Sequence, residues 1–146
     1  MTHRPNFSSA RGFTLLEVLV ALLVLGIGLL GLAGLQVQAL RFNHDSYVRS
    51  QATILAYDMF ERMRLNKAQG AAYAGGDPGG ACNDPGNALA LNDRVCWHGF
   101  IAGTLPGGNA TITAGANNLY TITINWLDRN SGNNRTQSWA AVIPPT

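Results

Sequence analysis

Residues 11–41 read RGFTLLEVLVALLVLGIGLLGLAGLQVQALR. No residue between Glu17 and Arg41 carries a charge, and residues 18–35 consist only of Leu, Val, Ile, Ala and Gly. A helix needs about 20 apolar residues to cross a bilayer, so this stretch is long enough to do so. The sequence therefore predicts a membrane-spanning helix near the N-terminus.

The short segment before the apolar run is basic. It contains Arg4 and Arg11 and no acidic residue. Because positively charged flanks tend to stay in the cytoplasm, we expect residues 1–12 on that side. The residues after Arg41 are then expected on the other side of the membrane.

A secretory signal peptide is the alternative interpretation of a basic flank followed by an apolar run. Its cleavage site would follow the run, but residues 33–37, AGLQV, make a poor Ala-x-Ala site. The run is also longer than the apolar region of a signal peptide, which usually has about 7–15 residues. A retained helix is therefore favoured.

The junction between the basic flank and the apolar run, residues 11–18, reads RGFTLLEV. It resembles the class III leader junction of type IV prepilins and pseudopilins: a short basic leader ending in Gly, then Phe, then an acid at the fifth position of the mature chain. The resemblance implies that prepilin peptidase cleaves after Gly12 and N-methylates the new terminal Phe13. It covers the leader and long helix well, reaches residues 120–126 weakly, and does not specify the rest.

Glu17 is the acid at the start of the charge-free helix. A carboxylate deep in a bilayer costs roughly 2.5–3.5 kcal/mol, so such residues usually have a partner. Cleavage after Gly12 would give Phe13 a free α-amino group, the nearest positive charge for a neighbouring subunit's Glu17. Such pairing would fix the stagger between subunits, because a mispaired buried charge is costly. The alternative is an interfacial acid favoured by the positive helix N-terminus.

Residues 17–36 resemble the minor pilins of type IV pili, those of the PilV type in particular, and less closely the pseudopilins of type II secretion. The resemblance implies an α+β, pilin-like fold: a long N-terminal helix packed against a small antiparallel β-sheet. Residues 1–12 would be the cleaved leader and residues 13–40 the transmembrane and filament-core half of the helix. Residues 41–68 would be its amphipathic half, and residues 69–146 a periplasmic loop and β-sheet region.

The resemblance also implies a location and partners. The chain would cross the inner membrane once, with its C-terminal region in the periplasm, and then enter the pilus filament at the cell surface. Its partners would be other minor pilins, the major pilin, prepilin peptidase, the inner-membrane assembly platform and membrane lipid. Its role would lie in initiation and assembly of the pilus. A type II secretion pseudopilin is the alternative, because it shares every N-terminal feature.

Other functional classes have less support. The net charge is only +2 at pH 7 and the basic residues are scattered, so no nucleic acid is predicted as a partner, although DNA uptake as a competence pilin stays an alternative. No histidine sits in a recognisable nucleophile or metal motif, so an enzyme is not predicted. No acidic series has EF-hand spacing, so neither a metal nor a cofactor is expected.

Four glycines interrupt the predicted span: Gly26, Gly28, Gly31 and Gly34. Each costs about 1 kcal/mol of helix propensity in water relative to Ala. Small residues permit close approach of helices in membranes, although the spacing here is not a clean Gly-x-x-x-G ridge. The other interpretation, slightly favoured, is a stretch that can unwind in the filament, as the resemblance suggests.

Beyond Arg41 the sequence predicts an amphipathic continuation of the helix. Its apolar residues recur at spacings of three and four: Val48, Ala52, Leu55, Met59 and Met63. This spacing predicts that one face packs on a core. The helix is expected to end between Asn66 and Gly70, where Gly-rich sequence begins.

Residues 70–86 are dense in Gly, Ala, Asp and Pro, which predicts a surface loop. Cys82 and Cys96 match neither a Cys-x-x-Cys redox pair nor a zinc-ligand series. A single disulfide between them is the economical interpretation for a region outside the cytosol.

Residues 120–126 alternate apolar and polar side chains, which predicts a half-buried strand. Residues 110–113 and 135–143 offer two further strands, so an antiparallel sheet lying on the helix is the simplest arrangement. The three tryptophans are expected to be core anchors in preference to ligand platforms: Trp97, Trp126 and Trp139.

Overall fold

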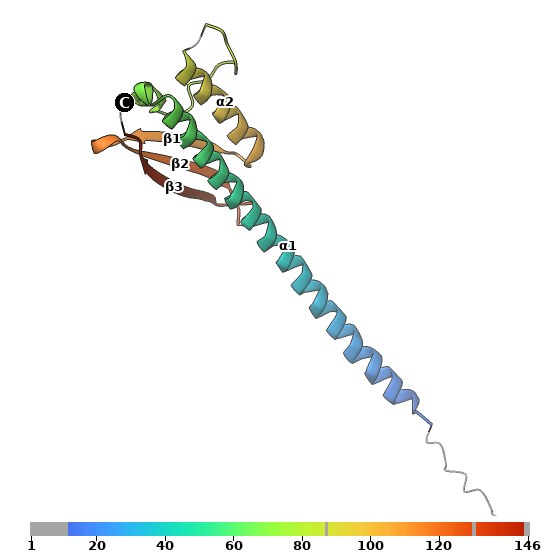
Figure 1. Ribbon diagram of the computed structural model, residues 1–146. Helices are drawn as coiled ribbons and strands as arrows, with labels where there is room; N and C mark the ends of the chain where they lie inside the picture. The colour runs from blue at the N-terminus through green and yellow to red at the C-terminus, as the bar shows by residue number, and fades with distance from the viewer. Residues whose placement is uncertain (1–11, 87, 130, 145–146) are drawn as a thin grey trace, which may run out of the picture. The chain divides into compact units, whose positions relative to one another are not determined.

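The computed structural model describes residues 12–86, 88–129 and 131–144 (Figure 1). Its elements, in chain order, are α1 (Leu15–Leu65), the 3-10 helix η1 (Lys67–Tyr73), α2 (Leu89–Thr104), β1 (Asn109–Ala114), the 3-10 turn η2 (Ala116–Asn118), β2 (Leu119–Leu127) and β3 (Asn134–Val142). Contacts divide the chain into an N-terminal unit, Met1–Leu40, and a second unit, Arg41–Thr146, which we call the head. The long helix and small antiparallel sheet confirm the predicted α+β, pilin-like fold.

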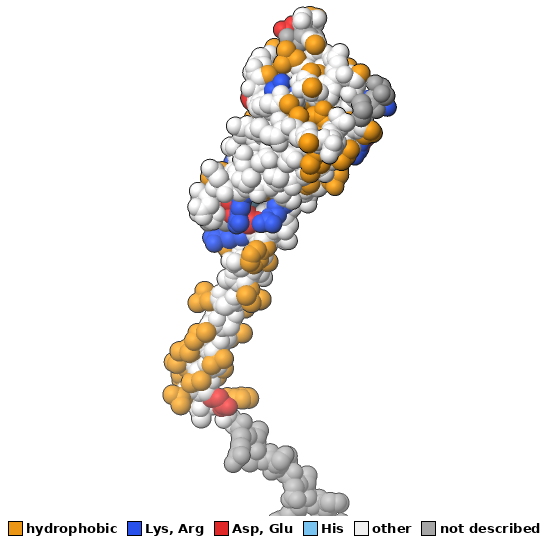
Figure 2. Space-filling model, turned by 90° about the vertical axis from the view of Figure 1, so that its left-hand side faces the viewer, with side chains coloured by type: hydrophobic (Ala, Val, Ile, Leu, Met, Phe, Trp, Pro, Cys, Tyr) orange, Lys and Arg blue, Asp and Glu red, His pale blue; other side chains and the backbone are white. Residues whose placement is uncertain are grey.

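In the N-terminal unit, α1 is an uninterrupted α-helix that packs on nothing. Every described residue of this unit is exposed, and Figure 2 shows hydrophobic side chains distributed along it. The helix continues through all four central glycines, and a side chain added at any of them would meet no atom within 4 Å. Within the described residues, α1 contains the one segment long and apolar enough to cross a membrane.

In the head, the second half of α1 buries one face, as the apolar spacing predicted. Its buried residues are Val48, Ala52, Ala56, Met59, Phe60 and Met63. The buried face is wider than the predicted stripe because α1 lies across one face of the sheet and beside α2 (Figure 1). Leu55, at the margin of this face, is half-buried and packs against the core.

The sheet has three antiparallel strands in the order β1-β2-β3. Ile112 lies opposite Ile122, and Ile122 lies opposite Trp139. Along β2 the buried residues alternate with less buried ones, which confirms the predicted half-buried strand: Tyr120, Ile122, Ile124 and Trp126 face the core. Of the three tryptophans, Trp97 and Trp126 are buried and Trp139 is half-buried against the core.

Helix α2 was not predicted, because the C-terminal region was expected to hold only loop and sheet. It buries Trp97, whose indole Nε1–H donates to the backbone carbonyl of Leu55 at 2.8 Å. Gly99 and Gly103 weaken its helix propensity, and no side chain caps its N-terminus. The helical spacing of its buried residues was nevertheless present in the sequence: Ala90, Val95, Trp97, His98 and Ile101.

The end of α1 also differs from the prediction. The α-helix ends at Leu65, just before the expected range, and the chain continues as η1. Gly70 and Tyr73 are buried, so the start of the predicted surface loop belongs to the core. Gly70 fits there because a side chain would lie 2.7 Å from the hydroxyl of Tyr120.

The turn between α2 and β1 generates a stability prediction at Gly108. A Cβ at this position would lie 2.7 Å from the carbonyl oxygen of Ile101 and 2.9 Å from the Cβ of Leu105. We expect Gly108→Ala to lower the free energy of unfolding by about 1–3 kcal/mol, the usual cost of overpacking. Urea unfolding of the full chain in detergent, followed by tryptophan fluorescence, measures this.

Gly103→Ala is the matched control. It adds the same methyl group in the last turn of α2, where nothing lies within 4 Å, and it should leave stability unchanged or raise it by up to about 1 kcal/mol. Equal stabilities for the two variants would contradict the packing described at Gly108.

Candidate functional site

The predicted processing junction lies in the open. Gly12 and Phe13 precede α1 and are exposed, Phe13 by 83%. A side chain at Gly12 would meet no atom within 4 Å. Nothing in the chain's own fold therefore requires glycine there, and a requirement for glycine would have to come from a protein that binds the junction.

Thr14 caps the N-terminus of α1. Its hydroxyl Oγ1 accepts the backbone N–H of Glu17 at 3.3 Å, and its carbonyl accepts the same N–H at 3.1 Å. Serine and threonine are favoured at this position because they satisfy N–H groups that lack a partner within the helix. The sequence analysis missed this cap, although Thr-x-x-Glu has the spacing of a capping box. The cap uses the backbone of Glu17 and leaves its carboxylate available.

Glu17 lies in the first turn of α1 and is exposed. None of the ion pairs between described residues includes it. Glu17 and Phe13 border one shallow, mainly apolar groove whose other lining residues are Val18, Ala21, Leu22 and Leu25. The structure thus places the junction and Glu17 next to each other, and no cation of residues 12–86, 88–129 or 131–144 pairs with the carboxylate.

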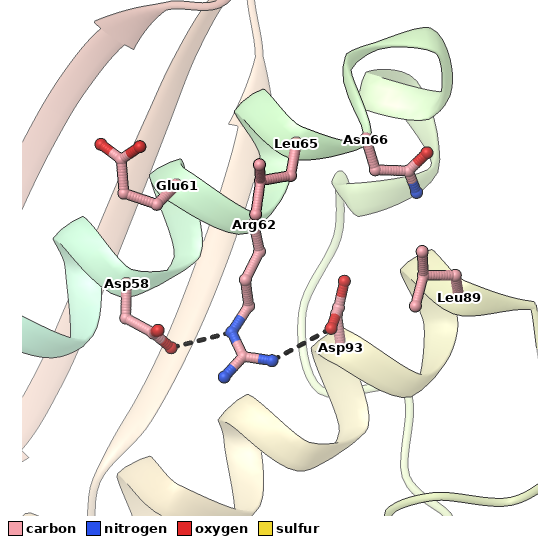
Figure 3. A pocket seen from close by; sticks show the side chains of 7 residues that line it. All are labelled: Asp58, Glu61, Arg62, Leu65, Asn66, Leu89 and Asp93. Atoms are coloured by element: carbon pink, nitrogen blue, oxygen red, sulfur yellow. Dashed lines mark hydrogen bonds and ion pairs between the residues drawn. The ribbon is translucent and has the colours of Figure 1, made fainter.

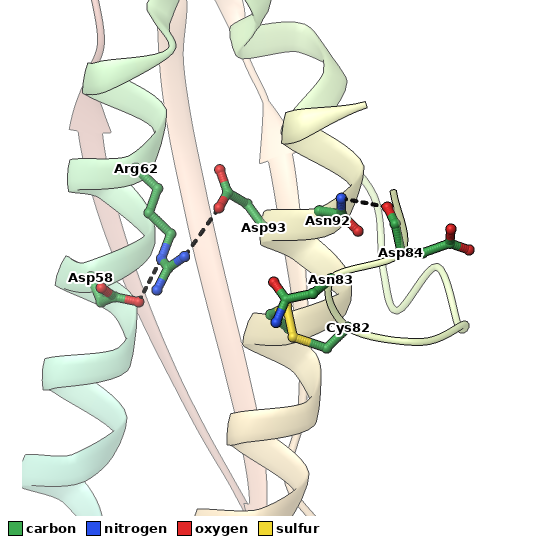
Figure 4. Close-up of a disulfide and its surroundings, with 8 residues drawn as sticks. Asp58, Arg62, Cys82, Asn83, Asp84, Asn92 and Asp93 are labelled. Carbon is green, nitrogen blue, oxygen red and sulfur yellow. Dashed lines mark hydrogen bonds and ion pairs between the residues drawn. A yellow bond between two sulfur atoms is a disulfide. The ribbon is translucent and has the colours of Figure 1, made fainter. Parts of the chain in front are cut away.

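Cys82 and Cys96 form a disulfide in the head, with their Cα atoms 4.6 Å apart. The bond attaches the loop before α2 to the middle of that helix (Figure 4). A second attachment lies close by, because the side-chain amide of Asn92 donates to the carbonyl of Asp84 at 2.8 Å. Asn83 adopts φ 64°, in the left-handed region where asparagine is several-fold enriched.

A polar network that the sequence analysis also missed joins α1, η1 and α2, and Figure 3 shows its side chains from α1 and α2. The Nε of Arg62 donates to Asp58 at 2.9 Å, and its Nη1 donates to Asp93 at 3.0 Å. The hydroxyl of Tyr73 donates to the other oxygen of Asp93 at 2.6 Å. A hollow of about 420 Å³ adjoins this network. Its charged groups already pair with one another, so the network serves to hold the three helices together.

Two titratable groups of the head are perturbed by their surroundings. Burial and the hydrogen bond to Asp93 raise the pKa of Tyr73 to about 12, so its hydroxyl stays protonated and donating at neutral pH. Burial lowers the pKa of His98, which lies edge-on to Trp97. No group of three or more His, Cys, Asp or Glu side chains among the described residues could hold a metal ion.

Two sequence families match the chain. Residues 7–33 match the prokaryotic N-terminal methylation motif, and residues 34–76 match the family described as type IV pilin Tt1218. The first match includes Gly12, Phe13 and Glu17. The chain therefore carries a prepilin leader motif and is similar to type IV pilins over residues 34–76. No curated protein and no solved structure matched it.

The two matches support a similarity to type IV pilins and do not specify a particular kind of pilin. Pilins are structural proteins and not enzymes, and they assemble with other pilins after processing by prepilin peptidase. Neither match names PilV, so the assignment to PilV-type minor pilins stays a prediction. Residues 77–146, which include α2 and all three strands, lie outside both matches.

The disulfide generates a prediction about the pilin-like head. Replacing both Cys82 and Cys96 with Ser should lower the free energy of unfolding by about 3 kcal/mol, because the bond closes a loop of some 15 residues. Unfolding of the full chain in detergent, with and without reductant, measures this loss.

Alkylation gives the direct check on the same bond. Both cysteines of the protein purified without reductant should resist alkylation and should react only after reduction. Free reaction of both thiols in the folded, non-reduced protein would show that the bond is absent.

Proposed function

We propose that this chain is the precursor of a minor pilin that helps to initiate and assemble a type IV pilus. It is anchored in the inner membrane by residues 13–40, with the head in the periplasm. Prepilin peptidase removes residues 1–12 and methylates Phe13. The mature chain then joins other pilins through its N-terminal helix.

This proposal rests on the N-terminal half of α1, whose apolar side chains are exposed and whose first turn carries the acidic residue Glu17. None of the residues that the structure describes buries the N-terminal half of α1, so a bilayer or other helices must cover it. Within such a cover, Glu17 needs a partner because an isolated charge is costly there. The free amino group that cleavage creates at Phe13 of a neighbouring subunit supplies one.

Assembly into a filament would also give a use to the four central glycines of α1. The helix of the isolated chain is continuous through them, and no side chain fills the space beside them. They therefore serve no packing need within one subunit. Close contact between subunits and local unwinding in the filament both remain open as their use.

Processing provides the first test. The mature protein isolated from membranes should begin at Phe13 and carry one methyl group on its N-terminus, and mass spectrometry of the intact chain measures both. Gly12→Ala should still be cleaved, whereas Gly12→Val should accumulate as precursor because the peptidase must approach the backbone closely. A start after Leu32 would show instead that the apolar run is a cleaved signal peptide.

Glu17→Gln tests the assembly role. Membrane insertion and cleavage should persist, because the cap on α1 uses only the backbone of Glu17. Surface pili should fall at least tenfold, since the variant removes the charge that pairs with a neighbour. Electron microscopy of pili and crosslinking to partner pilins in membranes give the readouts.

Glu61→Gln is the matched control for this variant. Glu61 is an exposed acid of α1 in the head that pairs with Arg64, and its loss should leave pili unchanged. Wild-type pili in Glu17→Gln would contradict the assembly role. Intact pili with impaired type II secretion would instead favour a pseudopilin.

A further inference from the structure

The two edges of the sheet differ in whether a further segment of the chain bonds to them. At the outer edge of β1, the N–H of Gly75 donates to the carbonyl of Ile112 at 2.8 Å, and the N–H of Ile112 donates back at 2.9 Å. Strand β3 forms the other edge. Among the described residues, no segment forms such a bridge to its outer side (Figure 1).

The pairing with β2 shows which backbone groups of β3 point outward. The N–H of Ile143 donates to the carbonyl of Asn118, and that of Asp128 donates to the carbonyl of Asn133. Hydrogen-bonded pairs alternate along antiparallel strands, so the odd-numbered residues of β3 bond to β2. The even-numbered residues direct both backbone groups away from the sheet: Asn134, Thr136, Ser138, Ala140 and Val142.

The hydrophobic core is incomplete on the same side. Ile122 is completely buried, whereas Trp139, which lies opposite it on β3, is only half-buried. Ala141 packs against the core with the same partial burial. A further strand beside β3 would cover both side chains on the α1 side of the sheet.

Strand β3 has only one of the usual features that prevent edge pairing, an inward-pointing charge at Arg135, which Asp128 neutralises. Such features include prolines, bulges and inward-pointing or lysine charges. Residues 134–142 contain no proline and a single charge, Arg135, which pairs with Asp128 at 2.9 Å. The register with β2 runs without a bulge over all nine residues.

We propose that β3 is a docking edge that accepts an extended strand from a different protein of the same assembly. Only a strand offers N–H and C=O groups in the alternation that the outward groups of β3 require. The docked strand is uncharged, with apolar residues against Trp139 and small polar residues on the opposite face. There they continue the row formed by Thr111, Thr123 and Ser138.

A second copy of this chain does not fit as the partner. Antiparallel pairing of two β3 strands places a two-fold axis perpendicular to the sheet. This axis reverses the direction of residues 41–65 of α1, which lie in the head with the sheet. Arg41, where the proposed membrane segment ends, would then leave the two heads in opposite directions. Pairing of β3 with a second copy's β1 would compete with the Gly75 bridge at Ile112, in the middle of β1. The exclusion of antiparallel pairing between two β3 strands rests on the membrane anchor of the proposed function.

Site-specific photocrosslinking in cells tests the docking edge. The full chain carries a photoreactive amino acid at Thr136, Ser138 or Ala140, one position at a time, and mass spectrometry identifies the residue captured. A docked strand predicts a ladder: each step of two residues along β3 moves the captured residue by two in one partner segment. The same probe at Thr111, on the same sheet face of β1, should give no ladder.

Ser138→Pro tests the backbone contribution directly. It removes an outward N–H that the sheet itself does not use, so the fold should persist and crosslinking from Ala140 should fall at least tenfold. Ser138→Ala keeps the N–H and should crosslink as the wild type does. If Ser138→Pro fails to fold, as judged by circular dichroism, Ser138→Lys adds an edge charge without altering the backbone and replaces it.

The outcomes separate the two proposals. A ladder on another protein, lost in the edge variant, supports the docking edge. Overturning results are a ladder on a second copy of this chain, captured residues without a two-residue step, no capture, or capture unchanged by the edge variant. The N-terminal residue of the same sample reports separately on the proposed function, so a chain that begins at Phe13 but gives no ladder refutes the docking edge alone.

Discussion

The structure depends on one constraint: the first half of α1 has no cover within the chain. Its Leu, Val and Ile side chains are exposed along its whole length, and exposed apolar surface of this extent is unfavourable in water. The helix keeps its own hydrogen bonds, which satisfies the backbone in a bilayer as well as in a bundle of helices.

The head is built on the second half of the same helix. Trp97 bonds to the carbonyl of Leu55, and Arg62 links Asp58 on its own helix to Asp93 on α2. These contacts attach α2 to α1 at two positions along the helix, while the sheet packs on another part of the helix surface. The same element, α1, also contains the apolar residues of the N-terminal unit, because it is assigned from Leu15 to Leu65.

Local sequence patterns predicted the parts of the fold that depend on local chemistry. The two-residue alternation of β2 and the apolar spacing of α1 were sufficient for those elements, and Gly12, Phe13 and Glu17 were recognisable because they lie next to one another. Helix α2 escaped prediction because its glycines and the Gly- and Pro-rich loop before it hide a helical spacing. The Arg62–Asp93 pair could not be inferred without α2, since 31 residues separate its members.

The small bridge between Gly75 and Ile112 has a consequence for stoichiometry. Gly75 adopts φ 125°, and a side chain there would lie 2.7 Å from the guanidinium of Arg94. Only glycine brings the backbone this close to β1. Because the outward groups of Ile112 are already used, a further strand on β1 would have to displace the Gly75 segment, whereas β3 carries no such bridge among the described residues. A strand docked on β3 as proposed is therefore expected to bind one-to-one, without stacking of the heads into an open-ended fibre.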